Sequence, residues 1–293
     1  MAIRKRVNVP RVTPSPSIEK RKPKLGQHFL VDESAAVEIV EALGDISQRT
    51  VFEIGPGRGM LTSLLARRAR RLIAVELDRV LAAQLRMQFN QSRNVEIIEG
   101  DVLAIDFHTV FGPRPGITRT ENQTTERVAA IGNIPYYITS ELLLRLFEHR
   151  KYLESMLLMV QREVAERLAA TPGGSEYGLL SATAQLYSRV DRLFTLPPGA
   201  FSPPPKVHSA VVRLTIEPRL EELQVPEQEF INFLKVSFAQ KRKTLWNNLK
   251  SHYRPEELEL ALRTAGIKPA LRAEALSLEQ SAAVFRALHH GNS

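Results

Sequence analysis

The sequence predicts an α/β fold with a mostly parallel sheet covered by helices, followed by a smaller domain made only of helices. Short apolar runs typical of buried strands alternate with helical patterns from residue 32 to residue 160. A glycine-rich turn follows the first of these strands, at the position where such sheets bind ligands. After Pro218 only helical patterns remain. We therefore expect two folded domains that meet near this proline.

The expected elements follow from apolar periodicity and from the residues that begin or end a helix. A helical pattern begins at Asp32 and ends near Gly44. Five strands are then expected, at 51–54, 72–77, 95–98, 128–131 and 156–160, separated by helices that start near 61, at 80 and near 142. Two more strands, at 189–196 and 207–216, have too short a connection for a crossover helix, which favours antiparallel pairing. The last helices are expected at about 227–238, 242–251, 255–264 and 277–289.

Two segments fall outside this pattern. Residues 1–22 are basic, contain three prolines and show no apolar period, so we expect a disordered arm. Residues 111–127 are rich in Gly, Pro, Thr and Asn and are expected to form a surface insertion. The predicted organisation is thus an arm at 1–22, an α/β domain at 23–217 and a helical domain at 218–293.

The net charge of +8 points to a nucleic-acid partner, but its distribution matters more than its sum. Residues 1–25 contain eight bases and one acid, and so carry seven of the eight net charges. Two basic clusters remain in the body, at Arg67–Arg71 and around Lys241–Lys243. A cluster of this kind is as often a solvated helix face as an RNA-binding surface.

Composition excludes several classes of site. The chain has no cysteine, which excludes disulfides, thiolate metal sites and thiol catalysis, and we expect no bound metal. No apolar run reaches the roughly eighteen residues of a membrane span, and no apolar stretch follows the basic N-terminus. We therefore expect a cytoplasmic protein with neither a membrane span nor a secretory signal.

The first candidate site is the turn Gly55-Pro56-Gly57-Arg58-Gly59, which joins a strand to a helix. Glycines at 55 and 57 let backbone amides approach a ligand closely. A dinucleotide site has its third glycine five residues after the first, and Met60 stands there instead. The turn therefore favours a cofactor other than NAD, although such a turn also occurs without a ligand.

Two acidic residues close the next two strands. Glu76 ends the second strand, where a carboxylate can accept hydrogen bonds from both hydroxyls of a ribose. Asp101 follows the third strand, where it can accept a hydrogen bond from an adenine amine. Either acid alone is more typical of a solvated strand end or a helix cap. Together with the glycine turn, they predict a pocket for an adenosine-bearing cofactor.

The tetrad Asn133-Ile134-Pro135-Tyr136 follows the fourth strand and predicts the substrate. The lone pair of the adenine N6 amine is delocalised into the ring, so its attack on a sulfonium methyl needs acceptors that bind the amine hydrogens. The side-chain oxygen of Asn133 and a backbone carbonyl next to Pro135 can be these acceptors, and Tyr136 can stack on a flipped base. No strong general base is required, because the leaving group is a neutral thioether. The tetrad therefore predicts methyl transfer from S-adenosylmethionine to adenine N6.

With these motifs, the chain resembles the small-subunit ribosomal RNA adenine N6-dimethyltransferase family, from about residue 23 to the C-terminus. The resemblance implies a Rossmann-like S-adenosylmethionine-dependent methyltransferase sheet. The string Lys24–Leu30 is similar to the opening motif of the family. It implies that His28 and Leu30 contact the cofactor, in addition to Gly55, Glu76, Asp101 and Asn133.

Two further strings carry the resemblance. Phe201–Val207 is similar to a signature whose phenylalanine faces the target base, which implies a third catalytic residue, Phe201, beside Asn133 and Tyr136. Outside that context, a phenylalanine among prolines is more typical of core packing. The string 238–249 resembles an RNA-contacting helical signature. Ile134 stands where the family more often has leucine, which leaves the backbone acceptor unchanged.

The resemblance implies dimethylation of two adjacent adenosines in a hairpin near the 3′ end of 16S rRNA. The partner would be the 30S particle, with a role in its biogenesis, and we expect a monomer. One alternative is a 23S rRNA adenine methylase of the macrolide-resistance type, which shares the pocket. Another is a ribosome-assembly factor without enzymatic activity. The Phe201 loop and the helical signature favour the first reading.

We predict that RNA affinity depends strongly on salt and that deletion of residues 1–20 weakens this dependence. The deleted segment carries most of the net charge, so fewer counterions are released on binding. Fluorescence anisotropy over a salt series gives the slope of log affinity against log salt for both chains. An unchanged slope would show that the arm does not touch RNA.

Overall fold

The computed structural model describes residues 27–111 and 127–290 of the 293. The predicted arm at 1–22, and the predicted insertion at 111–127 apart from its two end residues, lie outside the described residues. Within the described ranges, no helix is long and apolar enough to cross a membrane.

A seven-stranded sheet with the strand order β4-β3-β2-β5-β6-β9-β7 forms the centre of the molecule. The strands are β2 (Thr50–Ile54), β3 (Arg71–Glu76), β4 (Val95–Glu99), β5 (Val128–Asn133), β6 (Leu153–Gln161), β7 (Ser188–Leu196) and β9 (Ser209–Ile216). The first five are parallel to one another, whereas β9 is antiparallel to both β6 and β7. The predicted parallel sheet and the predicted antiparallel pairing of the last two strands are both confirmed.

The side chains of each central strand alternate between two apolar clusters. In β2, Val51 belongs to the cluster on one face and Phe52 to the cluster on the other. The strands β3, β5 and β6 divide their side chains in the same way. Both faces must therefore be covered, which explains why these strands are continuous apolar runs.

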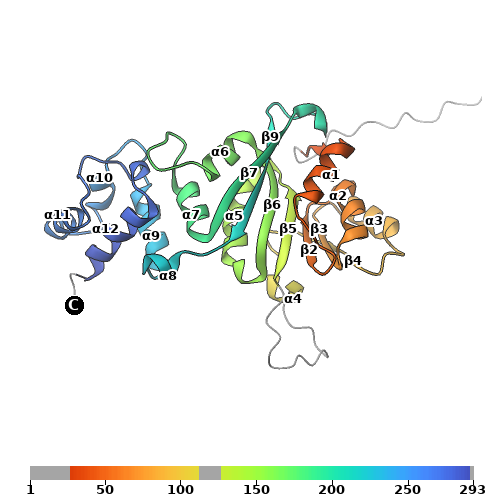
Figure 1. Cartoon of the computed structure of the whole chain (residues 1–293), viewed down its shortest axis with the longest axis horizontal. Coiled ribbons are helices and arrows are strands. Elements are labelled where there is room, and N and C mark those ends of the chain that lie inside the picture. Colours follow the sequence, from red (N-terminus) through yellow and green to blue (C-terminus); the bar gives the residue numbers. More distant parts are fainter. Residues whose placement is uncertain (1–26, 112–126, 291–293) are drawn as a thin grey trace, which may run out of the picture.

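Helices cover both faces of the sheet (Figure 1). The cluster on one face includes residues of α1 (Glu33–Glu41) and α2 (Met60–Arg68), whereas the other includes residues of α5 (Thr139–Glu148) and α7 (Leu179–Tyr187). Asp32 caps α1 by accepting a hydrogen bond from the Ala35 amide, and Asp78 caps α3 (Arg79–Gln88) in the same way. These caps explain why the starts of both helices could be predicted to within a residue.

Several elements were not predicted. They are the helices α4 (Phe107–Phe111), α6 (Arg162–Leu168), α7 and α8 (Leu220–Leu223), the two-residue strands β1 (Phe29–Leu30) and β8 (Phe201–Ser202), and the 3-10 turns η1 (Tyr136–Ile138), η2 (Arg150–Tyr152), η3 (Pro198–Ala200) and η4 (Ala273–Ala275). Most of α7 is buried, so it lacks the polar face that makes a helix visible in a sequence. The others are too short to show a period.

The C-terminal helices gather at one end of the long axis of the molecule (Figure 1). They are α8 (Leu220–Leu223), α9 (Glu227–Ser237), α10 (Leu245–Leu249), α11 (Pro255–Thr264) and α12 (Leu278–His290). The helix α10 is shorter than predicted because Thr244 caps it by accepting a hydrogen bond from the Asn247 amide. One apolar cluster runs without interruption from the sheet to Phe230 and Phe285 of these helices. The domain boundary at 217/218 therefore stays a prediction.

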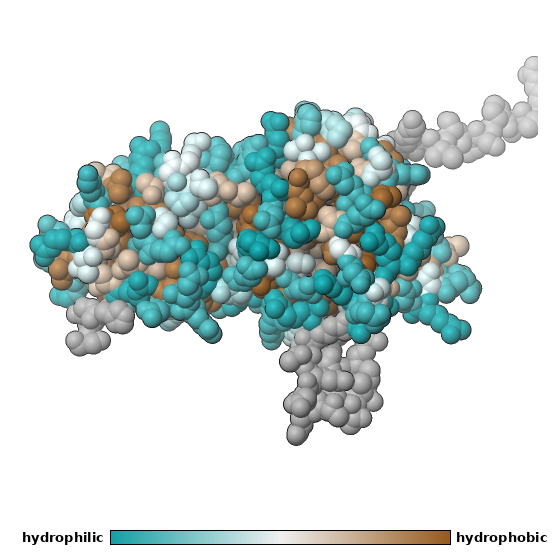
Figure 2. All heavy atoms as spheres, viewed as in Figure 1, coloured by the Kyte–Doolittle hydropathy of each residue, from teal (hydrophilic) through white to brown (hydrophobic). Residues whose placement is uncertain are grey.

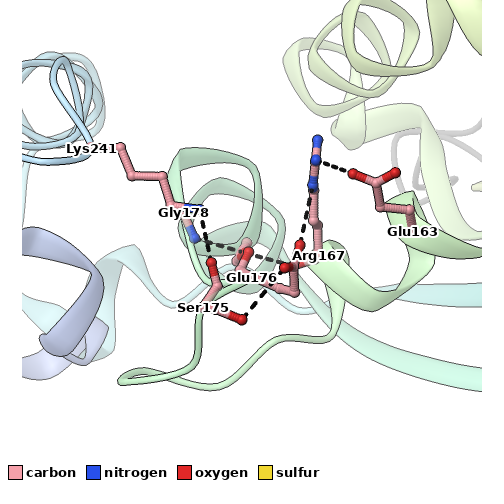
Figure 3. Close-up of polar contacts among 7 residues, drawn as sticks. Glu163, Arg167, Ser175, Glu176, Gly178 and Lys241 are labelled. Carbon is pink, nitrogen blue, oxygen red and sulfur yellow. Dashed lines mark hydrogen bonds and ion pairs between the residues drawn. The ribbon is translucent and has the colours of Figure 1, made fainter.

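Polar contacts also tie the C-terminal helices to the sheet region. The Glu227 carboxylate at the start of α9 accepts hydrogen bonds from Arg150 (2.6 Å) and from the Tyr187 hydroxyl (2.9 Å). On the loop before α7, the Ser175 carbonyl accepts a hydrogen bond of 2.8 Å from Lys241 Nζ (Figure 3). The next loop residue, Glu176, pairs with Arg167 of α6. These contacts hold the helices in a defined position beside the sheet.

The surface seen in Figure 2 is mostly hydrophilic over both the sheet region and the helical region. Apolar atoms show there in small, interrupted areas rather than in one broad patch. A polar partner suits this face better than a large apolar one.

Gly132 of β5 lies where the backbones of β5 and β2 approach closely, and we predict that Gly132→Ala destabilises the fold. A Cβ atom there would lie 2.7 Å from the Ile54 carbonyl oxygen, so the sheet would have to shift. The expected loss in the free energy of unfolding is on the order of 1–3 kcal/mol. Denaturant titration measures it. Gly199→Ala is the matched control, since nothing lies within 4 Å of its Cβ position, and equal stabilities of the two variants would contradict the prediction.

Candidate active site

A cavity lies at the carboxyl ends of the parallel strands, where open α/β sheets bind their ligands. The register of β2, β3, β4 and β5 brings their ends to one edge of the sheet. Seven of the nine predicted site residues line this cavity: His28, Gly55, Gly57, Glu76, Asp101, Asn133 and Tyr136. The other two, Leu30 and Phe201, do not.

The glycine turn needs glycine for reasons of both backbone and space. Gly55, Gly57 and Gly59 have positive φ angles of 65°, 58° and 82°, a region that residues with a side chain rarely adopt. A Cβ on Gly57 would also lie 2.9 Å from the Phe29 ring. The turn therefore packs directly against the N-terminal strand β1, which the sequence did not reveal.

Glu76 is held in place by the glycine turn. Its side chain is buried, and its two oxygens accept hydrogen bonds from the Gly57 and Asp78 amides, each 2.9 Å long. Burial raises the pKa of this carboxyl, although the two amides act in the opposite direction. Each carboxylate oxygen has a second lone pair, so both oxygens can still accept a hydrogen bond from a ligand hydroxyl.

Asp101 is exposed at the rim of the same cavity. Its Oδ1 accepts a hydrogen bond of 2.9 Å from the Leu103 amide, which is typical of a turn cap and orients the carboxylate. The other oxygen takes part in no recorded hydrogen bond within the described residues. It can accept a hydrogen bond from an amine of a ligand at the cavity rim.

Asn133 has a fixed orientation. Its Nδ2 donates a hydrogen bond of 2.6 Å to the His28 carbonyl, so its Oδ1 is left as the acceptor. The Pro135 carbonyl already accepts hydrogen bonds from Ile138 and Thr139. No such bond to the Ile134 carbonyl is recorded within the described residues. Of the carbonyls of Ile134 and Pro135, that of Ile134 is therefore the available acceptor.

His28 joins the strand-end motifs to the proline-rich loop. Its Nδ1 lies 2.7 Å from the Pro203 carbonyl, and its ring centroid lies 5.7 Å from that of Tyr136. The next two residues pair as β1 with β8, antiparallel. The Tyr136 hydroxyl lies 3.0 Å from Ser209 Oγ, at the start of β9. Sequence reasoning missed this role of Ser209, because no local pattern shows that β9 lies beside the tetrad.

Leu30 and Phe201 are paired with each other across β1 and β8, and both side chains are buried. Phe201 is only 3% exposed and packs in the apolar cluster that includes α1 and α2. The structure thus places both residues in the core. This agrees with the alternative hypothesis that Phe201 is a packing residue. Contact of Leu30 with the cofactor and of Phe201 with a base stays a prediction.

Glu53 is a buried acid that sequence reasoning treated only as part of a strand. It lies on β2 two residues before Gly55, is 1% exposed, and its Oε2 has no hydrogen-bond partner. With Gly55, Gly57 and Asn133 it lines a small cavity beside the main one. Burial, reinforced by the nearby charge of Glu76, raises the pKa of Glu53 to about 8. The presence of an acid inside an apolar strand was the sequence signal that could have identified Glu53 as a residue of the site.

No group of three or more His, Cys, Asp or Glu side chains in the described ranges could hold a metal ion. The cavity instead offers backbone amides, two carboxylates, an amide oxygen and a tyrosine ring. These groups suit an organic cofactor with hydroxyls and an amine.

Comparison with known proteins identifies the family. Residues 18–290 match the family described as "Ribosomal RNA adenine dimethylase". The chain belongs to this family. The membership confirms the predicted Rossmann-like methyltransferase fold, the enzyme class of rRNA adenine dimethyltransferase and S-adenosylmethionine as methyl donor.

Two curated relatives are similar over nearly their whole length. Both are named "Ribosomal RNA small subunit methyltransferase A". The protein from Koribacter versatilis is 55% identical over 272 residues, which cover 92% of this chain and 95% of the relative. The one from Acidobacterium capsulatum is 53% identical over 270 residues, 92% of each.

Two solved structures share the fold. A dimethyladenosine transferase from Plasmodium falciparum superposes with a TM-score of 0.71 at 24% identity and covers 90% of this chain and 98% of its own. The 23S rRNA methyltransferase ErmE superposes with a TM-score of 0.65 at 27% identity, and the match covers 89% of this chain and 99% of ErmE. The chain therefore shares its fold with both of these transferases.

We predict that Glu53 makes stability depend on pH in the absence of cofactor. The folded chain keeps this carboxyl protonated up to a pKa of about 8, whereas the ordinary value is 4.5. Between these values the folded state binds more protons, so the free energy of unfolding falls as pH rises from about 4.5 to about 8. Glu53→Gln, neutral at every pH, should melt several degrees above the parent at pH 8.5 and close to it at pH 5.

Differential scanning calorimetry across this pH range makes the comparison. Glu259→Gln, a substitution on the exposed side of α11, is the control and should leave the pH profile unchanged. A constant offset between Glu53→Gln and the parent at all pH values would contradict the prediction.

Proposed function

We propose that this enzyme dimethylates the N6 amines of two adjacent adenosines in a hairpin near the 3′ end of 16S rRNA, within the small ribosomal subunit. The observation that carries the proposal is the free Oδ1 of Asn133 beside the Ile134 carbonyl, at the mouth of the cavity. The names of the two relatives given above support the small subunit as the partner.

The residues of the cavity fit S-adenosylmethionine. The free lone pairs of Glu76 suit the two ribose hydroxyls, and the exposed oxygen of Asp101 suits the adenine amine. The glycine turn lets the ligand approach the backbone at Gly55 and Gly57. We propose these four residues, with His28, as cofactor-binding residues.

The methyl transfer needs few groups from the protein. The bound cofactor supplies an electrophilic methyl on a sulfonium centre. Asn133 Oδ1 and the Ile134 carbonyl accept the two N6 hydrogens, so the nitrogen lone pair is turned away from the ring and toward the methyl. The bound cofactor would give its methyl group to N6 and leave as a neutral thioether, and the amine would release one proton to water. Tyr136, fixed by Ser209, holds the flipped base by stacking.

The helical region contributes RNA contacts in this proposal. Lys241 is engaged with the Ser175 carbonyl (Figure 3), whereas Arg242 and Lys243 are exposed and take part in no recorded ion pair within the described residues. We assign Arg242 and Lys243 to phosphates and Lys241 to the attachment of the helices to the sheet region. Residues 218–293 would then form the RNA-contacting domain of a cytoplasmic enzyme.

A 23S rRNA target is the alternative, and the likeness to ErmE shows that the fold is compatible with it. Primer-extension arrest on both rRNAs after treatment of undermethylated ribosomes locates the modified nucleotides. Arrest at two adjacent adenosines of 16S rRNA supports the proposal, and arrest in 23S rRNA alone would replace it.

We predict that Asn133→Ala lowers the turnover number by on the order of 100-fold, because one of two acceptors for the reacting amine is lost. RNA affinity should stay within about twofold of the parent, since the phosphate contacts remain. Mass spectrometry of dimethyladenosine after reaction with 30S particles gives the turnover. Asn232→Ala on the exposed face of α9 is the matched control, and full activity of Asn133→Ala would exclude the assigned role.

A further inference from the structure

One aromatic side chain at the cavity has no role in the mechanism above. Tyr137 is 62% exposed and lines the same cavity as Asn133 and Tyr136. Among the described residues it is the only Phe, Tyr or Trp that is exposed. No hydrogen bond or ring contact of Tyr137 is recorded within them either. An exposed aromatic ring without partners at a binding cavity is available for a ligand.

The 3-10 turn η1 explains why Tyr136 and Tyr137 point in different directions. Consecutive side chains in such a turn are about 120° apart. The hydroxyl of Tyr136 reaches Ser209, and Ile138 packs against the apolar cluster that includes α5. Tyr137 is left on the outer side, where neither the sheet nor a helix covers it. The backbone of the turn is fixed by the hydrogen bond from Ile138 to the Pro135 carbonyl.

Tyr137 is therefore an ordered platform at the cavity mouth, next in sequence to the residue assigned to the target base. When one adenine is flipped into the cavity, the nucleotides on either side of it lose a stacking neighbour. Their exposed base faces lie near the mouth, because one nucleotide step separates them from the target. Base–aromatic stacking is the usual way in which proteins hold such unstacked bases.

We propose that Tyr137 forms a second base subsite, in which its ring stacks on the nucleobase adjoining the target adenine. The inference rests on the proposed function, since it needs an RNA whose target base is flipped. The ligand is an unpaired nucleobase of the substrate RNA. If both methylated adenosines are neighbours, each occupies this subsite while the other is in the cavity.

The test uses the full chain, labelled S-adenosylmethionine and undermethylated 30S particles. Tyr137→Ala should raise the KM for the particles by on the order of 5- to 100-fold, with the KM for the cofactor unchanged. Tyr137→Phe and Tyr137→Trp should stay within about threefold of the parent, because both keep an aromatic face. Met87→Ala, which removes a 76% exposed side chain on α3, is the control and should behave as the parent.

A second readout reports stacking directly. A hairpin RNA with 2-aminopurine in place of the base next to the target should lose fluorescence on binding to the parent and to Tyr137→Phe, but not to Tyr137→Ala. The product distribution should also change, with partly methylated RNA accumulating for Tyr137→Ala. A structural role alone would not produce this pattern in a variant with normal cofactor binding.

The outcomes separate the two proposals. No methyl incorporation by the parent chain would overturn the proposed function. Normal incorporation by the parent together with an unchanged particle KM and unchanged fluorescence for Tyr137→Ala would overturn the subsite alone. A raised KM for the cofactor without an effect on RNA would also overturn it, because Tyr137 would then belong to the cofactor pocket.

Discussion

The hydrogen bond from Asn133 to the His28 carbonyl determines how the rest of the site is arranged. It joins the residue before β1 to the end of β5 and leaves the Asn133 oxygen as an acceptor in the lining of the cavity. The same histidine bonds to the Pro203 carbonyl, so the proline-rich loop is held at the same point. Three segments that are far apart in the chain thus meet at one residue, and the reacting groups keep their orientation without a ligand.

The sheet provides the rigid frame for this junction. Its central strands are buried on both faces, so their carboxyl ends cannot move independently. Glu53 and Glu76 are placed in this frame at a cost in solvation, which shows in the raised pKa of each. The Glu76 carboxylate is oriented by backbone amides, whereas Glu53 Oε2 has no partner. The most desolvated acid therefore lies beside the residues assigned to the cofactor.

In the proposed function, the helical region extends the site toward the RNA. Its apolar cluster is continuous with that of the sheet, and Glu227 and Lys241 connect it to the sheet region through hydrogen bonds. The basic loop between α9 and α10, which contains Arg242 and Lys243, is consequently attached to the sheet region. A substrate that touches both this loop and the cavity must be large and negatively charged, as ribosomal RNA is.

The sequence by itself determined the alternation of strands and helices in the parallel half, the helix starts at Asp32 and Asp78, and the residues at the strand ends, because periodicity and caps are local properties. Seven of the nine residues that it proposed for the site line one cavity, and their roles stay predictions. Only the tertiary structure decided that β1 pairs with β8, that Phe201 and Leu30 are packed in the core, that Ser209 holds Tyr136, and that Tyr137 is left exposed. These features depend on contacts between residues far apart in the chain. A two-residue strand or a single side chain has no sequence period from which such contacts could be predicted.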